Sequence, residues 1–229
     1  MKAARIALIH ALAESVVPSH AAFAEFWPEA YAYDIFDASL AVDREAAGRL
    51  DDAMMERFQT LAGYAAGTRG RNGETAGILF TCSAFGPAID AVKPRLSIPV
   101  LRPNESAFAA ALGRGRRIGL VVSFAPSASA LERELQNMAE ARNMTVSVQT
   151  VISHGALAAL KSGNGHAHDR LVAEAAASLA GNDAVVLGQF SLARAASTIE
   201  ASGFEGRVIT TPGAAVAAMR DLVSQGRLA

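Results

Sequence analysis

Cys82 carries the side chain with the most versatile chemistry in this sequence. It is the only cysteine among 229 residues, and it lies in the stretch GILFTCSAFG, between an apolar run and a Gly-Pro pair. A thiol acts as a nucleophile or base only as the thiolate, which a helix N-terminus favours. A helix that starts near Pro87 would aim backbone N–H groups at the sulfur. Free cysteine also packs as a small buried hydrophobe, so position alone leaves reactivity and packing both open.

Polar residues also follow the other predicted strands, where α/β proteins assemble their ligand sites. Histidine is the usual acid or base near neutral pH, and His10 and His154 stand where a strand should open into a loop. For both we expect a solvated loop position. The remaining candidates of this kind are Ser15, Asn104, Glu105, Ser106, Ser123, Gln189, Ser191, Thr210 and Thr211.

Two further motifs favour ordinary structural roles. His166 and His168 form a close pair in a Gly-rich segment, but no Cys, Glu or Asp stands at a spacing typical of a metal site, so a cap or turn is expected there. The hydroxyls of SFAPSAS would suit a carboxylate or phosphate oxygen, although Ser127 or Ser129 as a helix N-cap is the simpler interpretation. Phosphate-binding glycine motifs are absent from the sequence.

The composition predicts a soluble protein of one large or two small domains. Hydrophobic residues make up 51% of the chain and charged residues 19%, and the net charge of −1 gives no overall attraction to nucleic acid or anionic membranes. The first twenty residues resemble a weak secretion signal, but the short RIALIH run and Glu14 favour a core strand. One cysteine cannot form an internal disulfide, which fits a reducing, cytoplasmic location.

Short apolar strands alternate with Ala-rich helices along the whole chain, which predicts parallel sheets covered by helices on both faces. The strands are expected at Arg5–His10, Tyr31–Phe36, Gly77–Thr81, Ile98–Leu101, Arg117–Val122, Thr145–Val151, Ala184–Leu187 and Val208–Thr210. Helices are expected at Asp43–Ala66, Ala88–Val92, Ser106–Leu112, Ala128–Arg142, His168–Ala180, Leu192–Ala201 and Gly213–Gln225. The segments GTRGRNGETAG and KSGNGHAH are expected to be surface loops.

A weak internal repeat links two of these strand ends. The segment Ile78–Val92 can be laid over Val185–Ile199 without a gap, which aligns Cys82 with Gln189. Two similar halves would bring both positions to one ligand cleft, although chance similarity between two βα units also explains such a match.

Taken together, these motifs make the chain resemble the aspartate/glutamate/hydantoin racemase superfamily. The motifs are IALIHA, GILFTCSAFG, IPVLRPNESAF, RIGLVVSFAPSAS, HDRLVAEAAASLAGNDAVVLGQ and VITTPGAAV, in this order over nearly the whole chain. The resemblance implies two flavodoxin-like, doubly wound parallel-sheet domains with pseudo-twofold symmetry and an active site in the interdomain cleft. The domains would be 1–102, completed by 209–229, and 103–208.

The resemblance also implies the chemistry and the site. Two cysteines would transfer protons at a carbon next to a carboxylate or carbonyl, without metal or organic cofactor. The first corresponds to Cys82, and the second falls on Gln189. A small carboxylate or hydantoin-like substrate would be bound in loops that contain His10, Ser15, Ser83, Ser123, Ser127 and Ser191. A homo-oligomer, a dimer or larger, is expected, with neither nucleic acid nor membrane as a partner.

The glutamine departs from the family pattern, because an amide does not titrate near neutral pH and cannot serve as the second proton-transfer group. His10 or His154 could supply a second base. Alternatively, Cys82 could act alone, as in the related arylmalonate decarboxylases, which carry their single cysteine in the other half, or the related maleate isomerases. An alternative of another class is a non-catalytic protein that binds small carboxylates, like the two-lobed periplasmic binding proteins.

Overall fold

The structure, a computed structural model, describes residues 3–226 and confirms an α/β fold with parallel sheets in two compact units. Unit 1 contains the chain up to Pro103 and the segment from Ala215 onward. Unit 2 contains Asn104–Ala214. The expected domain ends at 1–2 and 227–229 lie outside the described residues.

The sheet of unit 1 has the strand order β2-β1-β4-β5, and all of these neighbours are parallel. An antiparallel strand, β3, is added beside β4. The apolar sequence of β1 is buried along almost its whole length, as expected for a strand covered on both faces. The strands are β1 (Arg5–His10), β2 (Tyr31–Phe36), β3 (Arg69–Gly70), β4 (Gly73–Phe80) and β5 (Val100–Leu101).

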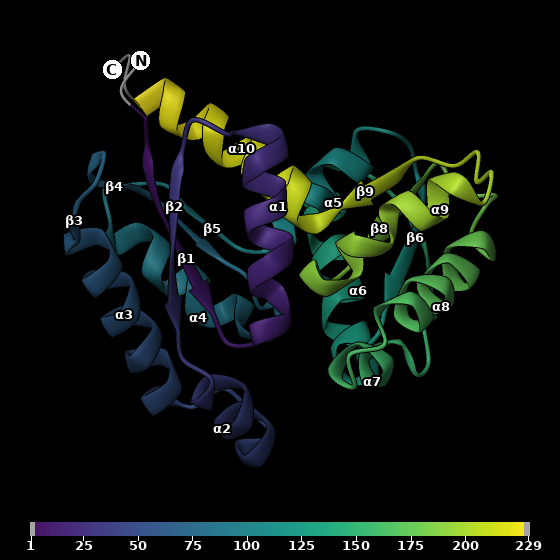
Figure 1. Ribbon diagram of the computed structural model, residues 1–229, viewed down its shortest axis with the longest axis horizontal. Helices are drawn as coiled ribbons and strands as arrows, with labels where there is room; N and C mark the ends of the chain where they lie inside the picture. The colour runs from purple at the N-terminus through teal and green to yellow at the C-terminus, as the bar shows by residue number, and fades with distance from the viewer. Residues whose placement is uncertain (1–2, 227–229) are drawn as a thin grey trace. The chain divides into compact units, whose positions relative to one another are not determined.

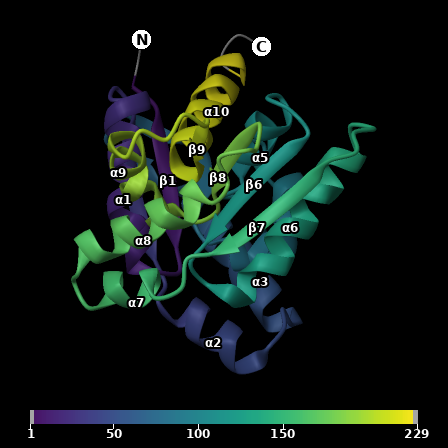
Figure 2. The same cartoon turned by 90° about the vertical axis from the view of Figure 1, so that its right-hand side faces the viewer.

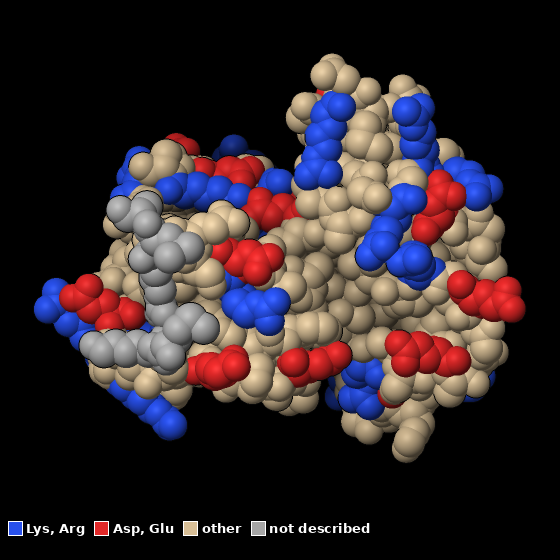
Figure 3. All heavy atoms as spheres, turned by 90° about the horizontal axis from the view of Figure 1, so that it is seen from above, with Lys and Arg blue, Asp and Glu red and all other residues tan. Residues whose placement is uncertain are grey.

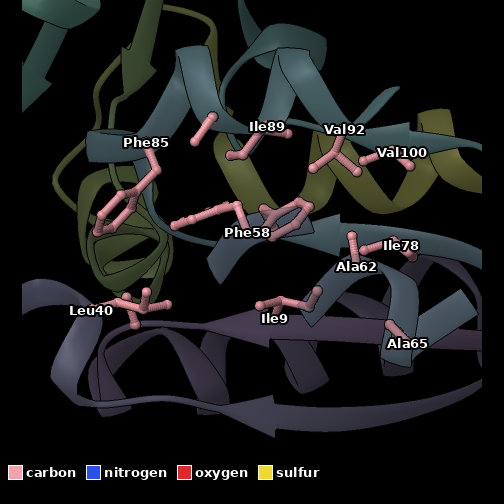
Figure 4. Close-up of a cluster of buried hydrophobic side chains, with 14 of the residues drawn as sticks. Ile9, Leu40, Phe58, Ala62, Ala65, Ile78, Phe85, Ile89, Val92 and Val100 are labelled. Atoms are coloured by element: carbon pink, nitrogen blue, oxygen red, sulfur yellow. The ribbon is translucent and has the colours of Figure 1, made fainter. Parts of the chain in front are cut away.

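Helices cover both faces of this sheet (Figure 1). Phe58 of α3 stacks on Phe80 and packs on Phe85, which closes the core between the sheet, α3 and α4 (Figure 4). On the opposite face, Met219 of α10 presses on Gly77 beside Ile6. The helices are α1 (Val16–Phe26), α2 (Ser39–Ala47), α3 (Asp52–Gly67), α4 (Gly86–Val92) and the greater part of α10 (Thr211–Gly226), with 3-10 turns η1 (Ala13–Ser15), η2 (Ser83–Phe85) and η3 (Lys93–Arg95).

Unit 2 has the strand order β7-β6-β8-β9, again all parallel. Alternate residues of β6 point to opposite faces: Leu120 packs with residues of α5 and α6, whereas Val121 packs with residues of α7 and α8. Figure 2 shows these helices beside the sheet. The elements are β6 (Arg117–Val122), β7 (Ser147–Ile152), β8 (Ala184–Leu187), β9 (Val208–Thr210), α5 (Glu105–Leu112), α6 (Ala125–Glu140), α7 (Ala156–Lys161), α8 (Gly165–Ala177), α9 (Ala196–Ala201) and the 3-10 turn η4 (Phe190–Ala195).

The two parallel sheets share one topology. In each, the first strand lies between the second and the third, and the fourth lies beyond the third. The ends of the central pair also match: the Thr81 N–H donates to the Ile9 carbonyl at 3.1 Å, and the Gly188 N–H donates to the Val121 carbonyl at 2.8 Å. The residue that follows these donors is Cys82 in unit 1 and Gln189 in unit 2, in the register of the sequence repeat.

The expected helix over 43–66 is wrong in one respect, because two helices occupy the region. Gly48 ends α2 with a φ of +66°, a conformation that glycine accepts without steric cost. The Asp51 side chain then caps α3 by accepting a hydrogen bond from the Met54 N–H. The sequence patterns did not predict α1 or α7.

The two segments expected to be loops contain regular structure. In the polar segment between Ala66 and Ile78, Asn72 and Gly73 adopt positive φ angles and turn the chain into the β3–β4 hairpin. In KSGNGHAH, Asn164 caps α8 by accepting from the Ala167 N–H. His166 and His168 therefore lie on a helix and not in a turn.

The C-terminal segment joins unit 1 later than expected. We expected this domain boundary at residue 209, but Ile209 and Thr210 pair with Val186 and Leu187 of β8 and so complete the sheet of unit 2. Helix α10 begins in unit 2 and belongs to unit 1 from Ala215.

Charged residues of both signs occur together on the face seen in Figure 3. The basic cluster Arg114–Arg117 follows this pattern. Asp183 accepts hydrogen bonds from the backbone N–H groups of Arg116 and Arg117 and from the Arg117 guanidinium, and these bonds lower the pKa of its carboxyl to about 2. The cluster is a turn at the start of β6 in which Asp183 pairs with the Arg117 side chain.

Gly188 offers a test of the strand end in unit 2. A Cβ at this position would lie 2.9 Å from Leu120 Cδ1 and 3.1 Å from the Val121 carbonyl, so Gly188→Ala should lower the free energy of unfolding by about 1–3 kcal/mol. Urea unfolding followed by circular dichroism measures this change. The control Gly181→Ala adds a methyl group that meets nothing within 4 Å and should change stability by less than about 0.5 kcal/mol. Equal stability of the two variants would contradict the packing seen at Gly188.

Candidate active site

Cys82 lies two residues after the end of β4 and directly before η2, where the backbone is still extended (φ −116°, ψ 122°). Its half-buried side chain packs against the aromatic core formed by α3, α4 and the sheet. A hollow too narrow for a water molecule lies beside it. The residues around the hollow are Ile9, His10, Ala11, Leu40, Phe58, Phe80, Cys82 and Phe85, several of which are labelled in Figure 4.

This apolar setting controls the protonation of the thiol. Burial raises the pKa of Cys82 to about 11, and the N–H of Ala84, which points at the sulfur, opposes this rise only partly. The expectation that a helix start would favour the thiolate is therefore wrong. The turn η2 has only three residues, so few aligned peptide dipoles face the sulfur. At neutral pH the resting group is a protonated thiol.

His10 is fully buried and not in a solvated loop. Its Nε2 lies 2.9 Å from Asp34 Oδ1, and its Nδ1 lies 2.9 Å from both Ser15 Oγ and Thr81 Oγ1. Burial lowers the pKa of His10, and Asp34 opposes this shift. Both ring nitrogens of His10 and the hydroxyl of Ser15 already have hydrogen-bond partners within the protein. In this arrangement neither side chain has a free hydrogen-bonding group for a substrate.

Unit 2 places a polar cluster at the equivalent strand end. Gln189 Oε1 accepts hydrogen bonds from the Ser123 N–H at 2.7 Å and the Ser123 hydroxyl at 3.0 Å. Gln189 Nε2 donates to Ser127 Oγ at 3.0 Å, and the Ser127 hydroxyl donates to the Phe124 carbonyl. The structure therefore brings Ser123, Ser127 and Gln189 together. Gln189 is half-buried, and because one Nε2 hydrogen is used in the bond to Ser127, the second remains for another acceptor.

The remaining predicted polar residues differ in burial and in hydrogen-bond partners. Ser83 is half-buried in η2, and Ser191 is buried in η4. Asn104 donates from Nδ2 to the Gly188 carbonyl at 2.7 Å. Within residues 3–226, its buried Oδ1 has no hydrogen-bond partner, and neither has the buried Oγ1 of Thr211.

The other predicted histidines take no part in the contacts described above. His154 is exposed after β7, as expected of a solvated loop. His166 is exposed on α8, and the buried His168 bonds through Nδ1 to Asp169. In the described part of the chain, no three His, Cys, Asp or Glu side chains are grouped to hold a metal ion. No helix within 3–226 is long and apolar enough to span a membrane.

Sequence reasoning missed Asp34 and Thr81, which complete the surroundings of His10. The signal for Asp34 is present in the sequence, because it is the one charged residue in the strand YAYDIF. Parallel pairing places Asp34 opposite Leu8, two residues before His10. Thr81 gives no comparable signal, since threonine is common at strand ends.

Comparison with known proteins identifies relatives of the whole chain. The family described as Asp/Glu/Hydantoin racemase matches residues 11–219. Allantoin racemase from Klebsiella pneumoniae has 20% identity and a TM-score of 0.67, and the match covers 98% of this chain and 89% of that one. Glutamate racemase isoform RacE1 from Bacillus anthracis has 13% identity and a TM-score of 0.67, with 99% and 84% covered.

A third structure, PH1733, an aspartate racemase homologue from Pyrococcus horikoshii OT3, has 15% identity and a TM-score of 0.66, with 98% of this chain and 100% of that chain covered. A search of curated proteins found no match. At these identities the structural similarities show a common fold.

The raised pKa of Cys82 predicts slow alkylation at moderate pH. With a pKa of about 11, the thiolate is scarce at pH 8, so iodoacetamide should modify the folded protein on the order of 100-fold more slowly than the unfolded chain. The rate should rise about tenfold per pH unit until the pH approaches the pKa. Mass spectrometry follows the reaction without ambiguity, because Cys82 is the only thiol. Equal rates for the folded and guanidinium-unfolded protein at pH 8 would show that burial does not raise this pKa.

Proposed function

Because the chain belongs to the Asp/Glu/hydantoin racemase family, we propose that it is a cofactor-independent isomerase that moves a proton at the carbon next to a carboxylate or carbonyl. The proposed substrate is a small carboxylate or a hydantoin-like ring, and the proposed acid or base is Cys82. We further propose a homo-oligomer located in the cytoplasm.

The observation that carries the proposal is the equivalence of the two strand ends. Cys82 follows β4, the third parallel strand of unit 1, and Gln189 follows β8, the third parallel strand of unit 2. The same backbone hydrogen bond to the neighbouring strand precedes each of the two residues. By the family resemblance, these are the two proton-transfer positions. In this chain one is a thiol and the other an amide.

The environment of Cys82 favours proton donation. A thiol with a pKa of about 11 holds its proton at neutral pH, and an enolate or carbanion formed beside it would take that proton readily. The same thiol becomes a base only after it has lost its proton, which the apolar hollow opposes. The N–H of Ala84 would stabilise the thiolate left after donation.

Gln189 supports a binding role. Its carbonyl oxygen already accepts two hydrogen bonds from Ser123, so the amide is held in one orientation. The second Nε2 hydrogen remains for a substrate oxygen, and Ser127 fixes the direction of the first. An amide held in this way binds and orients but does not transfer a proton.

The two histidines considered as a second base differ in availability. His10 is enclosed by Asp34, Ser15 and Thr81, and it would have to break one of these bonds to accept a proton from substrate. His154 is exposed at the end of the edge strand β7. Neither arrangement supports a role for these residues as the second base.

A second candidate function follows from the single thiol. If Cys82 protonates only one face of a carbanion, the reaction that suits it is loss of carbon dioxide from a malonate-type substrate, as in the related decarboxylases. The observation that favours this alternative is that the strand end of unit 1 carries a protonated thiol, Cys82, whereas the equivalent strand end of unit 2 carries a non-titrating amide, Gln189. Maleate-type isomerisation needs a thiolate nucleophile, which a raised pKa disfavours.

Proton NMR in D2O tests the proposal directly. Small α-substituted carboxylates and hydantoins are incubated with the protein, and exchange or decarboxylation at the α-carbon is followed over time. Cys82→Ser should lower turnover by about 10²- to 10⁴-fold, because a hydroxyl is a far weaker acid. The exposed Ser162→Ala variant is the control and should retain full activity. Full turnover in Cys82→Ser would refute the role of the thiol, and binding without turnover in the native protein would identify a binding protein.

The stereochemistry should change when position 189 becomes a thiol. If Cys82 is the only acid or base, the native protein should exchange deuterium at the α-carbon with retained configuration, whereas inversion by the native protein would reveal a second acid or base other than position 189. In either case Gln189→Cys should increase inversion by supplying an acid or base on the opposite face. Chiral chromatography of the product measures the change. The control Gln149→Cys adds a thiol on an exposed strand position and should leave the configuration retained. Unchanged stereochemistry in a folded Gln189→Cys variant would contradict the assignment of position 189.

A further inference from the structure

A continuous chain of hydrogen bonds runs from the surface of α1 to the residue before Cys82. His20 Nε2 lies 2.9 Å from both carboxylate oxygens of Asp34, and Asp34 Oδ1 lies 2.9 Å from His10 Nε2. On its other side, His10 Nδ1 lies 2.9 Å from Thr81 Oγ1. The chain thus joins a helix, the edge strand β2 and the two central strands β1 and β4.

Exposure falls along this chain toward the site. The side chain of His20 is 42% exposed, that of Asp34 is 35% exposed and that of His10 is fully buried. A buried imidazole flanked by one carboxylate is sensitive to the charge of that carboxylate, because water does not screen the pair on the buried side.

The donors and acceptors fix the direction of each bond. An ionised Asp34 only accepts, so the Nε2 atoms of His10 and His20 both carry hydrogen and Nδ1 of His10 carries a lone pair. The Ser15 hydroxyl donates to the Leu12 carbonyl at 2.7 Å, so Thr81 is the one hydroxyl left to donate to His10 Nδ1, at 2.9 Å. Thr81 Oγ1 also lies 2.9 Å from Ser15 Oγ and 3.3 Å from the Ile9 carbonyl, and the imidazole lone pair is the acceptor that has no other donor. The tautomer of His10 therefore holds the side chain of Thr81.

We infer that Asp34 and His20 are positioning residues for Cys82: through the tautomer of His10 they hold Thr81, and with it the strand end that presents the thiol. This inference rests on the proposed role of Cys82. The sulfur itself receives its hydrogen bond from the Ala84 N–H, so the hydrogen bonds from His20 to Thr81 act on Cys82 only through the backbone.

Three titratable groups face His10. Asp34 faces it from β2, His20 contributes from α1, and Cys82 shares the lining of the hollow with it. Burial lowers the pKa of His10, which favours the neutral imidazole and so the tautomer that its hydrogen bonds fix. A mutation that removes the charge of Asp34 should release the tautomer at every pH.

The test uses the full-length protein and two variants, Asp34→Asn and His20→Gln. Long-range proton–nitrogen NMR should show the Nε2–H tautomer of His10 in the native protein between pH 6 and 9 and a mixture of tautomers in Asp34→Asn. Iodoacetamide should modify Cys82 about tenfold faster in Asp34→Asn, because a loosened strand end exposes the sulfur to water and so reduces the burial that raises its pKa. His20→Gln should change the alkylation rate in the same direction by a smaller factor.

Turnover provides the third readout. A misplaced thiol should lower kcat in Asp34→Asn on the order of 10- to 100-fold while KM changes less. The controls are Glu29→Gln, an exposed carboxylate in the same unit, and His166→Gln, an exposed histidine on α8. Neither control should move the tautomer or the alkylation rate.

The outcomes separate this inference from the proposed function. A native His10 tautomer and a native alkylation rate in Asp34→Asn would overturn the inference whether or not the protein turns over any substrate. If both readouts change while Cys82→Ser keeps full turnover, the chain still positions Cys82 but the proposed function fails. His20→Gln alters only the surface end of the chain, so it keeps the test valid if Asp34→Asn folds poorly.

Discussion

The backbone bond from the Thr81 N–H to the Ile9 carbonyl extends the pairing of β1 with β4 past the last residue of β4. It brings His10 to the same end of the sheet as Thr81 and Cys82, although His10 precedes them by more than seventy residues in the sequence. The hydroxyl–imidazole contact, the hollow and the turn that delivers the Ala84 N–H all require this alignment. The equivalent Gly188–Val121 bond does the same for Gln189 and Ser123 in unit 2.

Two opposing effects act on the sulfur, and their sizes determine its chemistry. A helix N-terminus contributes the equivalent of roughly half a charge, and this influence fades within about one turn. Removing a thiolate from water into an apolar lining costs more, so desolvation prevails and the pKa rises to about 11. A single N–H from a short 3-10 turn is too weak to reverse that result.

Much of the fold follows from local patterns. The strands Arg5–His10, Tyr31–Phe36, Arg117–Val122, Ala184–Leu187 and Val208–Thr210 lie where the apolar runs predict them, because buried parallel strands need continuous apolar sequence. The register between Cys82 and Gln189 was also readable, since both follow strands of the same kind. The burial of His10 was not, because it depends on Asp34 and Thr81, whose positions are set only by strand pairing. The sign of the Cys82 pKa shift likewise depends on Leu40 and Phe58, which reach the sulfur through tertiary packing.

The route of α10 has a consequence for biosynthesis. Unit 1 is discontinuous: the residues that complete it come after all of unit 2 in the chain. During translation the sheet face around Ile6 and Gly77 therefore remains without Met219 until the last helix has left the ribosome, whereas every strand and internal helix of unit 2 is already available. Unit 2 can therefore fold while unit 1 still lacks α10, and one apolar face of the unit 1 sheet stays uncovered for that interval.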